Sequence, residues 1–114
     1  MSSKAEPVPT EPIHLSDDGD LDDVVSTYDV VLADFYADWC GPCQMMEPAI
    51  ESVAADTDAA VVKVDVDRFQ GLASQFGVQG IPALFLFADG ENVEQLVGMK
   101  SEEQLSNVID RYTE

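Results

Sequence analysis

The stretch of sequence that decides the fold runs from residue 33 to residue 43 and reads ADFYADWCGPC. Its first half belongs to the apolar run Val30–Ala37, which contains a single acid, Asp34. Such a run predicts a strand covered on both faces, as in a parallel sheet. The second half is a Gly-Pro turn between Cys40 and Cys43, and the pattern after it is that of a helix. The stretch therefore predicts a dithiol where a buried strand gives way to a helix.

Strands and helices are predicted to alternate on either side of this stretch, because the period of the apolar residues switches repeatedly. Helical spacing covers residues 21–28, 46–54, 69–76 and 105–112. Strands are predicted over residues 12–15, 30–37, 60–66, 83–87 and 92–97. Pro48 should kink the second helix, and Gly77 should end the third. Met45 and Met46 are both expected to be helix and core residues.

The order of these elements predicts an α/β fold of three layers, α/β/α, around one mixed sheet of four to five strands. Strands joined through a helix should pair in parallel. Asp89-Gly90 is a hairpin signal, so the last two strands should be antiparallel. Ser101 and Gln104 predict a capping box at the start of the last helix.

The 114 residues fit one domain, and a hydrophobic share of 46% allows a sizeable core. Residues 1–12 carry three prolines among polar residues and have no apolar core of a secretory signal. We expect residues 1–12 to be a mobile lead-in and residues 13–114 to be the folded domain. No run approaches the ~18 apolar residues that suggest a membrane span. The expectation is a cytoplasmic monomer without membrane contact.

The chain is strongly acidic, with 23 acidic residues against 5 basic ones and a formal net charge of −18. Nucleic acid and anionic membranes are therefore excluded as expected partners, because the field of the protein repels them. The acids are dispersed along the chain rather than gathered in a tail. One interpretation is a halophilic protein, because concentrated salt would screen the repulsion between its many acidic residues. The other is an acidic, well-solvated protein of ordinary surroundings.

Four interpretations of the Cys40/Cys43 pair compete. A structural zinc site needs four ligands, and with His14 as the one histidine the chain could supply them only as a dimer. A structural disulfide over so short a loop removes little entropy from the unfolded chain. Buried, inert thiols fit poorly with a Gly-Pro turn at a strand end. The redox-active dithiol remains, with no metal and no cofactor beyond its own disulfide.

The physical chemistry of the turn assigns a role to each of its residues. The start of a helix favours a thiolate, so Cys40, which is expected to face solvent, is the predicted nucleophile. Cys43, about one turn further along, is the predicted resolving thiol. Gly41 and Pro42 form the turn, and the fixed φ of Pro42 suits the first turn of a helix. Asp34 is predicted to have a raised pKa, suited to a general base near neutrality, unless it reaches water at a sheet edge.

These residues, together with three further motifs, resemble the thioredoxin family of the Trp-Cys-Gly-Pro-Cys type. The motifs are Gly80-Ile81-Pro82, the run 87–90 and Val97-Gly98, and the resemblance extends from about Ile13 to the C-terminus. It implies a thioredoxin-like fold and a thiol–disulfide oxidoreductase, a protein-disulfide reductase and redox carrier. Its partners would be disulfide-containing client proteins and a separate thioredoxin reductase. The Gly-Pro dipeptide matches reducing members, at about −270 mV against about −120 mV for a strong oxidant.

The resemblance also implies roles for matching positions. Asp34 matches the buried acid that relays the proton of the second cysteine, and Lys63 matches a lysine near that acid. Lys63 could equally be a solvated residue on the polar face of its strand. Pro82 matches a cis-proline beside the dithiol. The positions that match the apolar surface on which clients dock are Trp39, Gly80, Ile81, Pro82, Gly98 and Met99.

Four positions depart from common members of this family. Gln44 replaces a lysine and Asp38 adds a negative charge beside Cys40, so both weaken the support for a thiolate. Ala83 stands where threonine is common, and Tyr36 replaces a frequent tryptophan. Two rivals remain: a non-catalytic binding module of the same fold, and a disulfide isomerase, which its redox potential would distinguish.

Overall fold

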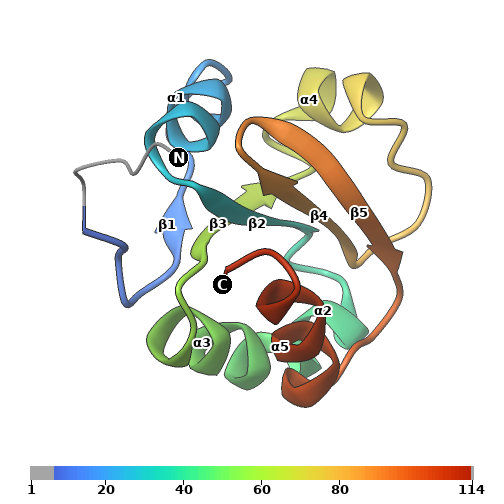
Figure 1. Cartoon of the computed structure of the whole chain (residues 1–114). Coiled ribbons are helices and arrows are strands. Elements are labelled where there is room, and N and C mark those ends of the chain that lie inside the picture. The colour runs from blue at the N-terminus through green and yellow to red at the C-terminus, as the bar shows by residue number, and fades with distance from the viewer. Residues whose placement is uncertain (1–6, 114) are drawn as a thin grey trace.

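The computed structural model describes residues 7–113 and shows a central sheet between two layers of helices (Figure 1). The sheet has five strands in the order β1-β3-β2-β4-β5. The strands are β1 (Ile13–His14), β2 (Val30–Tyr36), β3 (Ala60–Asp65), β4 (Ala83–Ala88) and β5 (Glu91–Val97). The helices are α1 (Asp20–Thr27), α2 (Gly41–Met45), α3 (Glu47–Asp56), α4 (Gln70–Gln75) and α5 (Glu102–Asp110). The predicted α/β/α fold and mixed sheet are confirmed.

The central strand β2 has a parallel neighbour on one side and an antiparallel one on the other. It pairs in parallel with β3 and antiparallel with β4. The expectation that a helical connection gives parallel strands is therefore right for β3 but wrong for β4. The connection through α4 begins and ends at the same edge of the sheet, so that Ala83 lies opposite Phe35, near the carboxyl end of β2. This reversal brings the segment before β4 to the edge where the cysteines follow β2.

The two faces of the sheet carry separate cores, as strand alternation requires. Phe35 and Phe85 point to one face, which α1 and α4 cover with Leu21 and Leu72. The opposite face is covered by α2, α3 and α5 (Figure 1). Its core cluster comprises Val30, Leu32, Met46, Ile50, Val53, Ala54, Ala59, Val61, Leu84, Leu86, Leu105 and Ile109. Asp34 lies two residues beyond Leu32 and therefore on this second face, beneath the helix layer that includes α2 with Cys43.

The helix predicted after the cysteines is divided into α2 and α3 at Met46, just before Pro48 in the first turn of α3. The kink predicted from Pro48 is found as a break between two helices at Met46, because proline has no N–H to continue the ladder of hydrogen bonds. Met46 is 2% exposed, as predicted, but Met45 is 70% exposed, so its prediction as a core residue is wrong. Neighbouring helical residues point about 100° apart, and only one of the two can face the sheet.

Three local predictions are confirmed by the backbone. Asp89 and Gly90, at φ 52° and 85°, form the turn between β4 and β5, since both central residues of a type I′ hairpin turn have positive φ. Gly77, at φ 67°, follows the end of α4. Ser101 and Gln104 make both hydrogen bonds of the capping box, at 3.1 and 2.9 Å.

The predicted lead-in, residues 1–12, is described only in part, since residues 1–6 lie outside the described residues. Residues 7–12 form no helix or strand, and Val8 is half-buried against the core on the α1 and α4 face. The mobility of the lead-in stays a prediction. Within residues 7–113, no helix is long and apolar enough to cross a membrane.

Candidate active site

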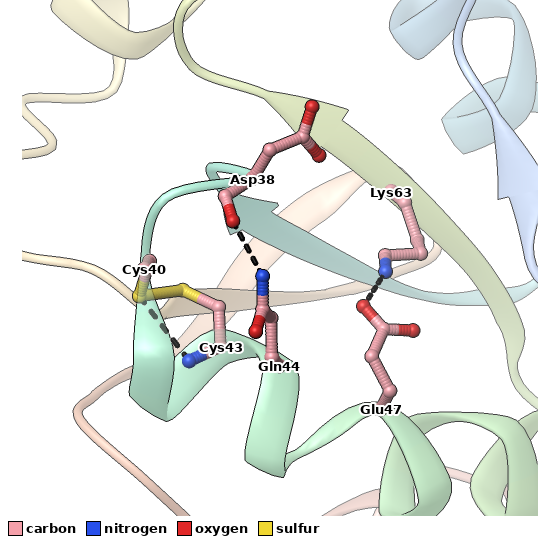
Figure 2. A network of polar contacts seen from close by, with 6 residues as sticks. All are labelled: Asp38, Cys40, Cys43, Gln44, Glu47 and Lys63. Atoms are coloured by element: carbon pink, nitrogen blue, oxygen red, sulfur yellow. Dashed lines mark hydrogen bonds and ion pairs between the residues drawn. A yellow bond between two sulfur atoms is a disulfide. The ribbon is translucent and has the colours of Figure 1, made fainter.

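Cys40 and Cys43 form a disulfide at the start of α2, directly beyond the carboxyl end of β2 (Figure 2). Their Cα atoms are 5.2 Å apart. Cys40 is the N-cap residue of α2, and its Sγ accepts a hydrogen bond from the backbone N–H of Cys43 at 3.2 Å. An N–H group directed at sulfur stabilises a thiolate relative to a thiol. The turn therefore supports negative charge on Cys40.

The exposure of Cys40 differs from the prediction that it faces solvent. Cys40 and Cys43 are each 4% exposed, so burial does not distinguish the two sulfurs. Both side chains pack with Ala37, and Tyr36, Val66 and Ile81 lie against this group. The prediction is wrong for the disulfide form because Cys40 Sγ is turned toward its partner and covered by these neighbours. The turn residues between them, Gly41 and Pro42, are exposed.

Asp34 is 4% exposed in the central strand, which confirms that it is buried and excludes the edge position. The pKa of its carboxyl is raised from 3.8 to about 7. Burial is the main cause, because it disfavours the charged form. The positive charge of Lys63 acts to lower this pKa, and the negative charge of Glu47 acts to raise it. Asp34 can thus exchange a proton near neutral pH.

Lys63 is 5% exposed, so it is not a solvated surface residue. It is paired with Asp34 in the register of β2 and β3, which places the two side chains on the same face. The Lys63 ammonium makes an ion pair with Glu47 at the start of α3 (Figure 2). It also lies 4.2 Å from the ring centroid of Tyr36, a cation–π contact. Lys63 is therefore near the buried acid, as predicted, but its ion pair is with a different carboxylate.

The segment before β4 reaches the dithiol from a distant part of the chain. The Ile81–Pro82 peptide bond is cis, as the resemblance implied. Ile81 packs against the two cysteines, and the Pro82 carbonyl accepts a hydrogen bond from the Gly98 N–H at 2.8 Å. Ile81 therefore lies beside the disulfide, and Pro82, which is itself buried, is linked to Gly98 by this hydrogen bond.

Comparison with known proteins agrees with this geometry. The family model described as thioredoxin matches residues 12–111. The chain belongs to the thioredoxin family. It is 41% identical to thioredoxin of Chlamydia muridarum over 99 residues, which cover 86% of this chain and 95% of that protein. It is 42% identical to thioredoxin of Staphylococcus saprophyticus over 97 residues, 83% of this chain and 92% of that one.

A solved structure of a mutant thioredoxin from Halobacterium salinarum is more similar in sequence. It superimposes with a TM-score of 0.92 at 57% identity, over 96% of this chain and 97% of that chain. A reduced thioredoxin pre-protein of Schistosoma mansoni gives a TM-score of 0.82 at 33% identity, over 90% of this chain and 98% of that one. The fold is therefore shared with relatives of quite different sequence.

Membership in the thioredoxin family makes this chain a thiol–disulfide oxidoreductase with its redox centre at Cys40 and Cys43. Thioredoxins use this intrinsic disulfide, act on disulfide-containing proteins and have thioredoxin reductase as their usual partner. Within the part of the chain that is described, no group of three or more His, Cys, Asp or Glu residues could hold a metal ion.

The remaining residues predicted for the thioredoxin docking surface are exposed. Trp39 is 70% exposed and its indole N–H donates to Asp67 Oδ2 at 2.8 Å, which fixes the ring. Met99 is 47% exposed and directly follows Gly98. Gly80 is exposed, and a Cβ atom on it would lie 3.9 Å from Val97 Cγ1. Val97 itself is 55% exposed and was not predicted.

Gln44, one of the departures from common thioredoxins, has a visible structural role. Its side-chain amide donates to the Asp38 carbonyl at 2.5 Å and so ties the helix to the loop before Cys40 (Figure 2). Both residues are exposed. A neutral amide thus occupies the position of a cation and stabilises the loop without adding positive charge.

Besides Val97, two acidic residues of the site were missed from sequence, Glu47 and Asp67. An acid in the first turn of a helix is ordinary, because it complements the helix dipole, so Glu47 carried no distinguishing signal. Asp67 follows β3 as one of many exposed acids. Only the packing of α3 on β3 and of the loop after β3 beside Trp39 reveals what these residues contact.

Proposed function

We propose that the chain acts as a reductant of disulfides in client proteins, with Cys40 as nucleophile, Cys43 as resolving thiol and Asp34 as proton relay. The observation that carries the proposal is the amide hydrogen bond to Cys40 Sγ, together with a buried acid on the sheet face beneath α2. A separate thioredoxin reductase returns the two electrons. The cytoplasm is the proposed location, and the protein works as a monomer.

In the first step, the Cys40 thiolate attacks one sulfur of a client disulfide. The client S–S bond breaks, a mixed disulfide forms, and the second client sulfur leaves as a thiolate that takes up a proton. In the second step, Cys43 gives its proton to Asp34 and attacks Cys40 Sγ. The mixed disulfide breaks, the client leaves as a dithiol, and the Cys40–Cys43 disulfide forms. Two electrons have passed from the dithiol to the client.

The hydrogen bond from the Cys43 N–H to Cys40 Sγ supports Cys40 rather than Cys43 as the attacking residue. Since both cysteines are equally buried, exposure gives no preference, and the argument for Cys40 is electrostatic. The N–H of Cys43 is directed at Cys40 Sγ, which favours the thiolate at that position. The client strand would lie across Ile81, Pro82 and Gly98, with Trp39, Gly80 and Met99 completing the apolar surface around the disulfide.

The experiment that tests the direction of electron flow is the reduction potential of the Cys40/Cys43 pair, measured by equilibration with a dithiol buffer of known potential. We expect a value of about −270 mV, that of a reducing member. A value of about −180 mV would indicate an isomerase, and one of about −120 mV an oxidant. A pair that does not equilibrate at all would favour the binding module. Cys40→Ser is the blank, because it cannot form the disulfide.

We also propose that the protein works in concentrated salt. Its formal charge of −18 is unusual for 114 residues, and a relative of 57% identity comes from Halobacterium salinarum. Among the described residues, Asp34 is the one buried acid. Other described acids lie at or near the surface, where dissolved ions screen their mutual repulsion.

The salt proposal predicts a strong dependence of stability on KCl. We expect the thermal midpoint to rise by roughly 10 °C or more between about 0.1 M and about 3 M KCl, because the range of repulsion falls from about 10 Å at about 0.1 M to about 3 Å at about 1 M and is shorter still at the higher concentration. Circular dichroism at both salt concentrations measures it, with a neutral osmolyte of equal osmolarity as the control. An equally cooperative and equally stable fold at low salt would remove the proposal.

A further inference from the structure

A row of titratable side chains crosses one face of the sheet, from the buried centre to the exposed edge. The strand register places Asp34 in β2 beside Lys63 in β3, and Lys63 beside His14 in β1. Paired residues of parallel strands point to the same face, so all three project toward the layer of α2, α3 and α5. Asp34 and Lys63 are buried, while His14 is exposed. Lys63 is thus the cation that the strand register places next to Asp34.

The Lys63 ammonium is held by two groups other than Asp34. Glu47, in the first turn of α3, makes the ion pair with it, and Tyr36 presents its ring face at 4.2 Å. Figure 2 shows the Glu47 side chain extending from the start of α3 to meet Lys63. The Glu47 side chain is 35% exposed, whereas that of Lys63 is 5% exposed. The ion pair therefore lies at the border between the buried acid and solvent.

A cavity of about 410 Å³ adjoins the solvent side of this ion pair. Its lining includes Lys63 and Glu47, together with Glu11, His14 and Glu51. Tyr36, two residues beyond Asp34 on the same face of β2, is influenced by the charges of Asp65, Asp38, Glu47 and Asp34. Cys40 and Cys43 follow in the active-site turn. The neighbour of Asp34 in β4 is the apolar Leu84. Lys63 is thus the one cation among these groups, apart from the protonated form of His14.

We infer that Glu47 is a positioning residue of the proton relay: it engages the Lys63 ammonium and so leaves the Asp34 carboxyl free to take and return the proton of Cys43. This inference rests on the proposed function, in which Asp34 is that relay. Without Glu47, the full charge of Lys63 would act on Asp34. An acid paired with a cation holds its proton less tightly and is a weaker base toward a thiol. Glu47 thereby keeps Asp34 basic enough for the resolving step.

The test compares two substitutions that should change the acid dissociation constant of Asp34 in opposite directions. Glu47→Gln keeps the size of the side chain but removes its charge, and the acid dissociation constant of Asp34 should increase about tenfold. Lys63→Met removes the cation, and the same constant should decrease about tenfold. Carboxyl carbon-13 NMR of the full chain in molar KCl follows the titration. Glu51→Gln is the matched control, since it lies one turn along α3 in the same cavity and changes the net charge equally.

The second readout is the resolving step itself. An aryl disulfide whose thiolate absorbs visible light reports two releases, the first on attack by Cys40 and the second on attack by Cys43. We expect the pH midpoint of the second release to follow the Asp34 titration, downward in Glu47→Gln and upward in Lys63→Met, with Glu47→Asp restoring most of the original profile. A merely structural role would weaken the fold without opposite shifts.

Two failures can be told apart. If Asp34 titrates in Glu47→Gln as it does in Glu51→Gln, the role of Glu47 is overturned, whatever Asp34 does in catalysis. If the Asp34 titration moves as expected and the second release does not follow, Glu47 acts on Asp34 as inferred. In that case it is the proton relay of the proposed function that fails.

Discussion

Replacing Cys43 with serine should convert the protein into a trap that remains covalently attached to its clients. Cys40 can still attack a client disulfide, but no second thiolate is present to break the mixed disulfide. On a non-reducing gel of cell extract, Cys43→Ser should give new bands that dithiothreitol removes. Turnover in dithiothreitol-driven reduction of a disulfide-bonded test protein should fall by at least about a thousandfold, because a serine hydroxyl is a poor nucleophile.

Cys40→Ser is the matched variant and should lose the same activity without forming the trapped bands. The pair of variants matters because Cys40 and Cys43 are equally buried, so that exposure cannot say which attacks first. Trapping by Cys40→Ser in place of Cys43→Ser would reverse the assignment. Wild-type protein that is folded but neither traps nor reduces would point to the binding module.

Replacing Asp34 with asparagine should stabilise the protein at alkaline pH and slow its chemistry. The carboxyl pKa is raised from 3.8 to about 7, so the native state holds a proton between these values that the unfolded chain has released. Stability therefore falls as pH rises through this window, by roughly 4 kcal/mol in all. Asparagine does not ionise, so the variant should not lose this stability as the pH rises. At pH values above about 8, Asp34→Asn should be more stable by about this amount, and below about 4 the advantage should vanish.

Urea unfolding in molar KCl across this pH range measures the effect. Lys63 keeps its ion pair with Glu47 in the variant, so no unpaired buried charge offsets the gain. Asp38→Asn, at an exposed position beside the cysteines, is the control and should change stability by less than about 0.5 kcal/mol. The resolving step of Asp34→Asn should slow by about a hundredfold, the usual size of general-base catalysis. A variant less stable than wild type at alkaline pH would contradict the burial argument.

Much of the fold follows from patterns that are local in the sequence. The apolar run 30–37 predicted a buried strand, and β2 is fully flanked by β3 and β4. The apolar spacing over 105–112 predicted α5, and the capping box fixed its start. These predictions succeed because burial on one or two faces imposes a period that short stretches reveal. The predicted direction of β4 was wrong, because a helical pattern between two strands does not say at which end of the sheet the connection finishes.

The active site, like the fold, has features that the sequence predicts and others that only the tertiary structure reveals. The sequence by itself determined the dithiol, the turn that carries it and the buried acid Asp34, since a cysteine pair around Gly-Pro and a lone acid in an apolar strand are visible without neighbours. Tertiary structure alone decided that Met45 is exposed, that both cysteines are covered and that Ile81 lies beside the two cysteines. It also decided that Lys63 engages Glu47. The period of a strand assigns a side chain to a face, but its partner comes from another element, and the two meet only when the helices pack on the sheet.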